Sequence, residues 1–378
     1  MAKHLVLAGG GHAHLTILKE LADFTARGHR VTLVSPEPFH SYSGMGPGLL
    51  GGSYRPEEVR FDVRAMTERA GGVYVAGEVE RVDAAARRLI LRDGAEIPYD
   101  VASFNLGSRV PLERLGGAGP GIVPVKPISG LATARAAILA TATATATSTV
   151  QPLRLLVVGG GPAGVEIAGN LCRLVEEHSI SAEISLVAGS RLLGAFPPKL
   201  RTKAFDSLSQ RQVTLCEGSR VVAVNHHRAV LDDGRFLPYD FAFVATGVVP
   251  PALFRQSLLP VGPDGGLRVN ARLQCDAHPE LFGGGDCIHF APRPLDKVGV
   301  HAVRQNPILC HNLLAALENK TLQSYTPQRD YLLIFNLGDG RGLLHRNGLV
   351  VDGRPAFRLK DWIDRRFMRR FQVSGEQG

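Results

Sequence analysis

The sequence predicts an α/β fold in which two parallel-sheet units of the Rossmann type occur in one chain. Residues 4–8 and 155–158 are short apolar runs, and glycine-rich turns follow them at 9–14 and 159–164. After the second turn, apolar residues recur at helical spacing. A strand, a glycine turn and a helix in that order place a pyrophosphate at the free N–H groups of the helix N-terminus. Two such turns therefore suggest two bound nucleotides.

Composition permits a large enzyme. The 378 residues exceed what one hydrophobic core usually serves, so two or three domains are expected. The net charge of +8 favours an acidic partner or an anionic membrane surface. No arginine-rich tract is interleaved with aromatic residues, so nucleic acid is not an expected partner. No run is long and apolar enough for a membrane-spanning helix.

The five cysteines, Cys172, Cys216, Cys275, Cys287 and Cys310, lie far apart in the sequence. None is spaced for a metal site or a Cys-x-x-Cys redox pair. We therefore expect no metal and a reduced, cytoplasmic protein.

The first glycine turn keeps Gly9 and Gly11, the two positions that contact phosphate, and His12 and Ala13 follow. His14 replaces the third glycine, which we expect to loosen the approach of helix to strand slightly. The next strand, 30–34, ends at Ser35, where many such folds carry an acid that binds ribose.

Residues 36–48 form a glycine- and proline-rich stretch that includes Ser43, Gly44 and Met45. We expect a long loop against which a cofactor ring rests, with a plain surface turn as the alternative.

A module recurs in the chain. Residues 98–108 resemble residues 238–247, and an Asp-Gly turn precedes each copy, at 93–94 and 233–234. Each copy predicts a hairpin followed by a strand that ends in glycine. Those strand ends, Gly107 in the first copy and Thr246 and Gly247 in the second, are candidate cofactor contacts.

The second turn has the full glycine pattern. Its candidate contacts are Gly159, Gly161, Pro162, Ala163 and Gly164. The strand that follows ends at Ala188 instead of an acid, and Ser190 and Arg191 come next. This slightly favours tolerance of NADPH, although one loop arginine is commonly just solvated.

Over residues 1–315 this order of parts resembles the two-dinucleotide-binding flavoprotein oxidoreductases, the superfamily of glutathione reductase and the type II NADH dehydrogenases. Residues 279–287 fit that resemblance, which implies that Asp286, next to Gly285, binds the ribityl chain of FAD. Shorter motifs at 9–14, 42–45 and 359–368 are similar to the flavoprotein module found ahead of selenide, water dikinase. The resemblance implies FAD as cofactor and NADH or NADPH as co-substrate.

The resemblance also implies a glutathione-reductase-like arrangement in which the second Rossmann-like unit is inserted in the first. We expect residues 1–112 and 248–325 to form the FAD domain, 113–247 the NAD(P)H domain, and 326–378 a C-terminal extension.

Differences between this sequence and the superfamily pattern reduce the number of reactions that the protein could catalyse. Disulfide reductases carry a cysteine pair just after the second strand, where this chain has Ser41, Ser43, Gly44 and Met45. Cys287 is the one cysteine that we expect close to the flavin, and a lone cysteine is more often a small buried residue. We expect hydride transfer to FAD and electron transfer onward to a quinone or another small redox acceptor.

Three residues are candidates for catalysis. Glu166 matches a glutamate that type II enzymes keep beside nicotinamide and quinone, where the helix start would stabilise it as an anion; a plain first-turn helix charge is the alternative. His301, after Val300, or Gln305 could bind a quinone carbonyl, or equally cap a helix or sit at a domain contact. Lys126 could reach the flavin edge, although an exposed strand lysine fits it better.

Two other functions stay open. One is an NAD(P)H-dependent reductase of an acidic carrier protein. The other is a non-catalytic flavin-binding sensor or partner subunit linked to selenium metabolism.

The C-terminal segment predicts an amphipathic helix. One face carries Leu359, Trp362, Ile363, Phe367 and Phe371, and the other faces carry Lys360 and several arginines. Such a helix suits an anionic membrane surface, so residues 359–371 predict peripheral contact with the inner face of the cell membrane. The same face could instead pack on the FAD domain or on a second subunit of a homodimer.

Overall fold

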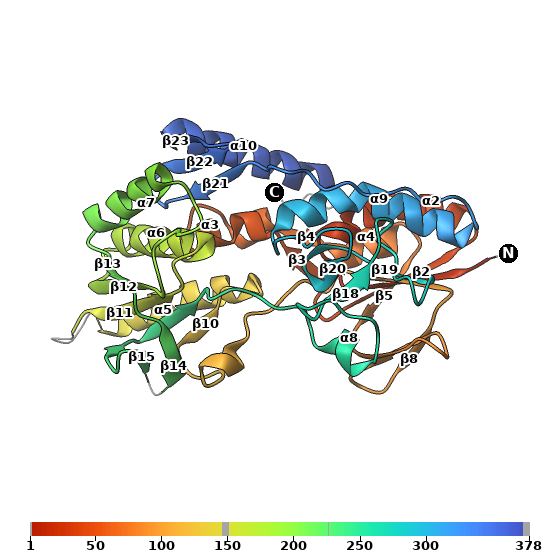
Figure 1. Cartoon of the computed structure of the whole chain (residues 1–378), viewed down its shortest axis with the longest axis horizontal. Coiled ribbons are helices and arrows are strands. Elements are labelled where there is room, and N and C mark those ends of the chain that lie inside the picture. The colour runs from red at the N-terminus through yellow and green to blue at the C-terminus, as the bar shows by residue number, and fades with distance from the viewer. Residues whose placement is uncertain (1, 146–150, 226, 373–378) are drawn as a thin grey trace.

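Two parallel five-stranded sheets organise the computed structural model, which describes residues 2–145, 151–225 and 227–372 (Figure 1). The first sheet consists of β19 (Leu281–Gly283), β9 (Val101–Phe104), β1 (His4–Ala8), β2 (Arg30–Ser35) and β5 (Val73–Ala76) in that spatial order. The second consists of β10 (Ile122–Pro124), β17 (Phe241–Val244), β11 (Leu153–Val158), β12 (Ala182–Ala188) and β13 (Thr214–Glu217). Because β19 follows the whole second sheet in the chain, the first sheet joins two separate segments. The predicted α/β class is confirmed.

Helices cover both sheets, as expected for parallel strands that are buried on both faces. Those of the first unit are α1 (Leu15–Lys19), α2 (Leu21–Ala26), α4 (Val63–Arg69), α8 (Leu253–Gln256) and α9 (Gly299–Leu317). Those of the second are α5 (Ser129–Thr145), α6 (Pro162–Glu177) and α7 (Pro198–Gln210). The two glycine turns lead from β1 into the short helix η1 (His12–His14) and from β11 into α6.

The predicted hairpin module occurs twice. Its strands are β6 (Val79–Asp83), β7 (Arg88–Leu91) and β8 (Glu96–Pro98) in the first copy, and β14 (Val221–Asn225), β15 (Arg228–Leu231) and β16 (Phe236–Pro238) in the second. The aspartates shape both turns, because Asp93 accepts a hydrogen bond from the Ala95 amide and Asp233 one from the Arg235 amide, each 3.0 Å long. Gly94 and Gly234 take positive φ values of 87° and 84°, which suit glycine.

Residues 36–48 are more ordered than the predicted loop. They contain β3 (Phe39–Ser41), η2 (Ser43–Met45) and the start of α3 (Gly46–Leu50), and β3 pairs with β4 (Arg60–Asp62). Pro47 does not prevent the helix, because the first turn of a helix does not need its N–H. The glycine and proline content therefore marked a helix start as well as a turn.

The C-terminal extension lies across both units (Figure 1). It comprises β21 (Leu333–Asn336), β22 (Gly342–Arg346), β23 (Leu349–Gly353) and α10 (Arg354–Phe371). Phe335 and Leu343 belong to the core of the second unit, whereas Met368 and Phe371 belong to the core of the first. Residues 373–378 of the predicted extension lie outside the described part of the chain. Among the described helices, none has the length and apolar character to cross a membrane.

Candidate active site

A cavity of about 760 Å³ runs along the carboxyl ends of the first sheet to the junction with the second unit. The residues that sequence reasoning selected and that line it are Gly9, Gly11, His12, Ser35, Ser43, Gly107, Lys126, Gly285 and Asp286. A crevice at the carboxyl ends of parallel strands is where α/β folds bind their ligands. The volume lies within the range of small-molecule and cofactor sites.

The first glycine turn is shaped by close backbone packing. A Cβ atom on Gly9 would lie 2.4 Å from the Asn105 carbonyl oxygen, and one on Gly11 would overlap the Asn105 side chain. By contrast, Gly107 at the cavity wall has a φ of 69° and no atom within 4 Å of an added Cβ. Glycine at the first two positions lets the turn close on β9, and Gly107 leaves room for a ligand. The cavity therefore fits an extended dinucleotide.

The second turn follows the same plan. An added Cβ on Gly159 would lie 2.4 Å from the Ala245 carbonyl oxygen, and one on Gly164 would collide with the Gly159 carbonyl. Gly161 faces open space, and Pro162 and Ala163 are exposed at the start of α6. The exposed residues around this turn are Ser190, Arg191, Thr246 and Gly247. A dinucleotide can therefore approach this helix N-terminus from solvent.

His14 compensates for the glycine it replaces. Its Nδ1 lies 2.6 Å from the Gly9 carbonyl oxygen, and its Nε2 lies 2.9 Å from the Ser103 hydroxyl oxygen. Burial lowers the pKa of this imidazole to about 4, so the ring is neutral at pH 7. The expected loosening is therefore countered by two contacts that tie the glycine turn to β9.

An ion pair at the cavity wall joins the two units. Lys126, which follows β10, places its Nζ 2.5 Å from Oδ2 of Asp286 and donates a second hydrogen bond to Ser108, 3.1 Å away. Ser108 donates to the same carboxylate oxygen at 2.7 Å. The interpretation of Lys126 as an exposed strand lysine is wrong, because its ammonium group is held by a carboxylate at the cavity.

His12 and His40 form a pair that sequence reasoning did not find. The Nδ1 of His12 lies 3.2 Å from the Nε2 of His40, and both residues line the cavity. Burial lowers the pKa of His40 to about 4 and that of His12 well below its usual value, so both rings are neutral. The signal was present, because His40 stands in the stretch after the second strand that we expected to contact a cofactor.

Glu166 lies away from this cavity, in the second turn of α6. Its carboxylate accepts a hydrogen bond of 2.7 Å from the backbone N–H of Asn336 in β21. Burial raises the pKa of Glu166 to about 7. The expected stabilisation of an anion by the helix start is therefore outweighed, because loss of water disfavours the charged form.

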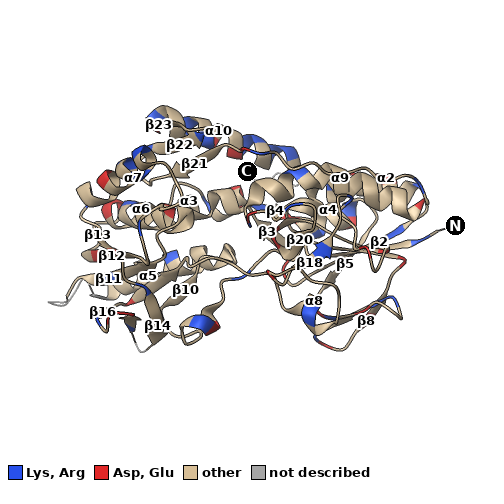
Figure 2. Ribbon diagram, in the orientation of Figure 1, with Lys and Arg blue, Asp and Glu red and all other residues tan. Residues whose placement is uncertain are grey.

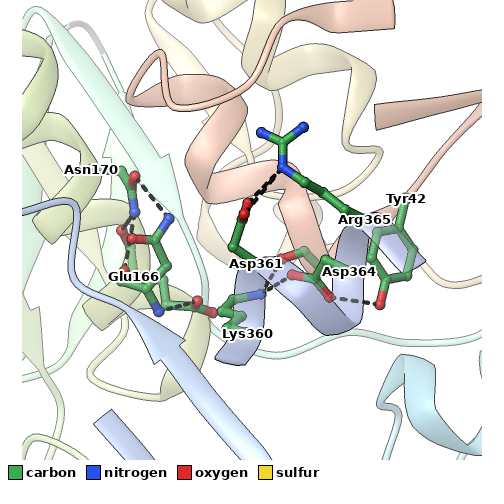
Figure 3. A network of polar contacts seen from close by, with 9 residues as sticks. Tyr42, Glu166, Asn170, Lys360, Asp361, Asp364 and Arg365 are labelled. Atoms are coloured by element: carbon green, nitrogen blue, oxygen red, sulfur yellow. Dashed lines mark hydrogen bonds and ion pairs between the residues drawn. The ribbon is translucent and has the colours of Figure 1, made fainter. Parts of the chain in front are cut away.

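Lys360 of α10 lies at the centre of a buried polar network (Figure 3). Its Nζ donates to Asp364 and to the Gly44 carbonyl oxygen, each at 2.7 Å, and Tyr42 donates to the other Asp364 oxygen at 3.1 Å. Burial acts to lower the pKa of Lys360, but the carboxylates of Asp364 and Glu166 raise it. The ammonium group therefore stays charged at neutral pH.

The prediction that Lys360 occupies a polar face of the C-terminal helix is wrong. Lys360 is only 8% exposed, whereas Leu359 and Trp362 of the predicted apolar face are 38% and 52% exposed. Phe371 of that face is buried and Phe367 is partly buried against the core of the first unit, where the Phe367 ring packs on Tyr42 with centroids 4.9 Å apart. The helix is thus rotated relative to the predicted face, because a partnered charge takes a core position.

Several other candidates do not line the main cavity. They are Ala13, Gly44, Met45, Glu166, Val300 and His301. His301 is buried in the first turn of α9, beside a small pocket shared with Asp286 and Gln305. The side-chain oxygen of Gln305 accepts the Gly285 amide at 2.7 Å, so this residue holds the turn that carries Asp286.

The cysteines offer no redox pair. All five are free, and Cys287 donates from its sulfur to the carbonyl oxygens of Phe104 and Gly284 at 3.4 Å. Burial raises the pKa of Cys287 to about 11, so its thiol is protonated at neutral pH and a poor nucleophile.

These features are those of a flavoprotein with two dinucleotide sites, and sequence comparison identifies the family. The model of the pyridine nucleotide-disulphide oxidoreductase family matches residues 3–312. The chain belongs to this family, which brings FAD as cofactor and NAD(P)H as co-substrate. The cavity geometry fits that cofactor.

Relatives extend the comparison along the chain. Human ferroptosis suppressor protein 1 is 24% identical over 374 residues, which cover 95% of this chain and 92% of the relative. Demethylphylloquinone reductase NdbB of Synechocystis is 24% identical over 371 residues, covering 93% and 89%. The internal alternative NAD(P)H-ubiquinone oxidoreductase A1 of Arabidopsis thaliana is 29% identical over 143 residues, which cover 36% of this chain and only 28% of the plant protein.

Among solved structures, NDH2 from Plasmodium falciparum in complex with NADH superposes with a TM-score of 0.83 at 14% identity. The match covers 97% of this chain and 96% of that one, and shows a shared fold.

Proposed function

We propose that this protein oxidises NAD(P)H through bound FAD and passes the electrons to a quinone. The observation that carries the proposal is a dinucleotide cavity without a reactive thiol, in a chain whose cysteines are all free. This arrangement does not support exchange with a disulfide. Relatives in Arabidopsis and Synechocystis are named as quinone reductases, which supports a quinone as the acceptor.

In this proposal residues 1–112 and 248–325 hold FAD, and residues 113–247 bind NAD(P)H. Gly9 and Gly11 accommodate the pyrophosphate, and Asp286 accepts hydrogen bonds from the ribityl hydroxyls. Lys126 orients Asp286 through their ion pair. Bound FAD supplies the capacity to accept a hydride and release electrons singly or in pairs.

The quinone is placed beside the polar network around Lys360, and this network supplies the protons for its reduction. Reduction of a quinone to a quinol consumes two protons, so a buried acceptor site needs groups that hold and release them. Glu166, with a pKa raised to about 7, exchanges a proton readily near neutral pH. Lys360 holds a positive charge beside it, which favours an acceptor oxygen that gains negative charge.

The exposed side of α10 is proposed to contact an anionic membrane. Leu359 and Trp362 are exposed there, and Figure 2 shows Lys and Arg along the helix. Arg366, Arg369 and Arg370 are exposed as well. An exposed tryptophan among arginines suits the headgroup layer, where the ring is partly buried and the guanidinium groups meet phosphates.

Anaerobic acceptor kinetics test the proposal. The purified protein with FAD is mixed with NAD(P)H and either a short-chain ubiquinone or an oxidised ferredoxin-type carrier. We expect the quinone to be reduced at a rate at least about tenfold above the carrier. A faster reaction with the carrier would instead support the carrier reductase, and failure of NAD(P)H to bleach the flavin would support the non-catalytic sensor.

A further inference from the structure

The carboxyl end of β12 is where the adenosine ribose of a dinucleotide lies in a fold of this type. β12 ends at Ala188, and Gly189, Ser190 and Arg191 continue it as a loop beside the second glycine turn. In NAD-selective sites an acid at this point binds the 2′-hydroxyl and repels a 2′-phosphate. Ala188 provides no such carboxylate.

The adjacent strand carries a carboxylate at the surface, but this carboxylate already has partners within the chain. Glu217 ends β13 and pairs in register with Ala188. Its Oε1 accepts a hydrogen bond of 2.5 Å from the Leu192 amide, and its Oε2 lies 4.0 Å from the Arg201 guanidinium. Glu217 therefore holds the loop after β12.

Two arginines flank the same loop. An added Cβ on Gly189 would lie 2.6 Å from Cγ of Arg220, so the Arg220 side chain passes directly over this glycine. The Gly218 amide donates to the carbonyl oxygens of Ala188, at 3.1 Å, and Ser190, at 2.8 Å, which holds residues 218–220 against the loop. Arg191 and Arg220 are exposed, and within the described part of the chain neither guanidinium forms a salt bridge.

We propose that Arg191 and Arg220 bind the 2′-phosphate of NADPH, and that the protein prefers NADPH to NADH. The inference rests on the proposed function, because it concerns the co-substrate of the same site. A planar guanidinium donates two parallel hydrogen bonds to a phosphate. Two guanidinium groups without an ion pair, beside a loop whose neighbouring carboxylate Glu217 is engaged by the Leu192 amide, favour a phosphate over a ribose hydroxyl.

Kinetics with both nucleotides provide one test. The holoprotein is assayed for flavin reduction by NADPH and NADH, as wild type and as Arg191→Gln and Arg220→Gln. We expect kcat/KM for NADPH to exceed that for NADH, and each substitution to lower the ratio by about tenfold, as for loss of a charged hydrogen bond. The matched control is Arg228→Gln, a surface arginine that lies over Phe236 in the same unit and should leave the ratio unchanged. A wild-type ratio at or below one would overturn the inference.

Calorimetry provides a second test that needs no turnover. Adenosine 2′,5′-bisphosphate and adenosine 5′-monophosphate are titrated into the holoprotein. We expect the bisphosphate to bind at least about tenfold more tightly, and both arginine variants to lose most of that advantage. Equal affinities in the wild type would refute the 2′-phosphate site. If neither nucleotide bleached the flavin while the bisphosphate still bound through both arginines, the proposed electron transfer would fail and this site would stand.

Discussion

The Nζ of Lys126 lies 2.5 Å from the Oδ2 of Asp286, across the junction of the two sheet units. Lys126 follows the edge strand of the second sheet, and Asp286 follows the edge strand of the first. Together with the hydrogen bond from Ser108, the pair fixes the carboxylate that family resemblance assigns to the ribityl chain. In the proposed flavin site, the same pair would link the binding of FAD to the relative position of the two units.

Replacing Asp286 tests its assignment. Asp286→Ala should weaken FAD binding by about 1.5–3 kcal/mol, because a charged hydrogen bond to the ribityl chain is lost. Flavin fluorescence during reconstitution of the apoprotein gives the affinity. Asp276→Ala, at an exposed aspartate bonded to Asn270, serves as the control. An unchanged affinity in Asp286→Ala would remove this residue from the flavin site.

The cysteines should be dispensable for chemistry. A variant with all five replaced should still show reduction of its flavin by NAD(P)H, because no pair is placed for disulfide exchange and Cys287 is a protonated, buried thiol. Alkylated wild-type protein should behave in the same way. Stopped-flow absorbance of the flavin measures the rate. Loss of reduction in Cys287→Ser, with FAD retained, would require a thiol mechanism.

The raised pKa of Glu166 predicts a pH-dependent stability. The folded state holds this proton more tightly than the unfolded chain, with a pKa of about 7 against 4.5. Its contribution to stability is therefore complete below pH 4.5 and is lost as the pH rises through 7. Relative to wild type, Glu166→Gln should gain about 1–3 kcal/mol between pH 5 and pH 8. Urea unfolding at both pH values measures this, and an equal difference at both would contradict the raised pKa.

Lys360 should be important for stability because its partners are buried with it. Lys360→Met leaves the Asp364 carboxylate without its counter-charge, which should cost about 3–5 kcal/mol. The matched control is Lys203→Met, which breaks the more exposed pair with Asp352 and should cost about 0–1 kcal/mol. Thermal unfolding compares the two variants. Similar losses of stability in both variants would mean that the buried pair contributes no more to stability than the exposed pair.

Membrane contact is tested best by exposed residues of α10. Deleting residues 359–378 would also remove Lys360 and Asp364, so it would perturb the fold. The triple variant Trp362→Ala, Arg366→Gln, Arg369→Gln should reduce flotation with anionic liposomes by at least about tenfold, since each charge adds about 1 kcal/mol. Phe236→Ala, at an exposed aromatic residue of β16, is the control. Flotation that is unaffected by the triple variant, or absent in wild type, would exclude this surface.

The sequence was sufficient for the parts of the fold that depend on local pattern. Glycine turns after apolar runs predicted the two β-strand-to-helix units, and Asp-Gly turns predicted both hairpins. These signals are local, because a tight turn requires particular residues at adjacent positions. The two copies of the module, which are similar in sequence, also have the same order of strands in the structure.

The parts that depend on distant partners could not be predicted in this way. The rotation of α10 follows from Lys360, whose partners include Gly44 and the charge of Glu166 on other elements. Hydrophobic periodicity assigns a lysine to solvent, because it does not take into account a buried counter-charge supplied by another element. His40 likewise gains its place only when β3 meets the first glycine turn, and the pKa of Glu166 depends on burial by β21.

Anaerobic single-turnover spectroscopy on the alkylated holoprotein would show whether electrons pass from NADPH through the flavin to a quinone without a thiol. One equivalent of NADPH should bleach the flavin absorbance, and one equivalent of a short-chain ubiquinone added next should restore it while quinol appears in equal amount. Thiols play no part in this sequence, so alkylation should leave both phases unchanged. A flavin that NADPH does not bleach, or a reduced flavin that the quinone does not reoxidise, would contradict electron transfer from NADPH to quinone by this protein.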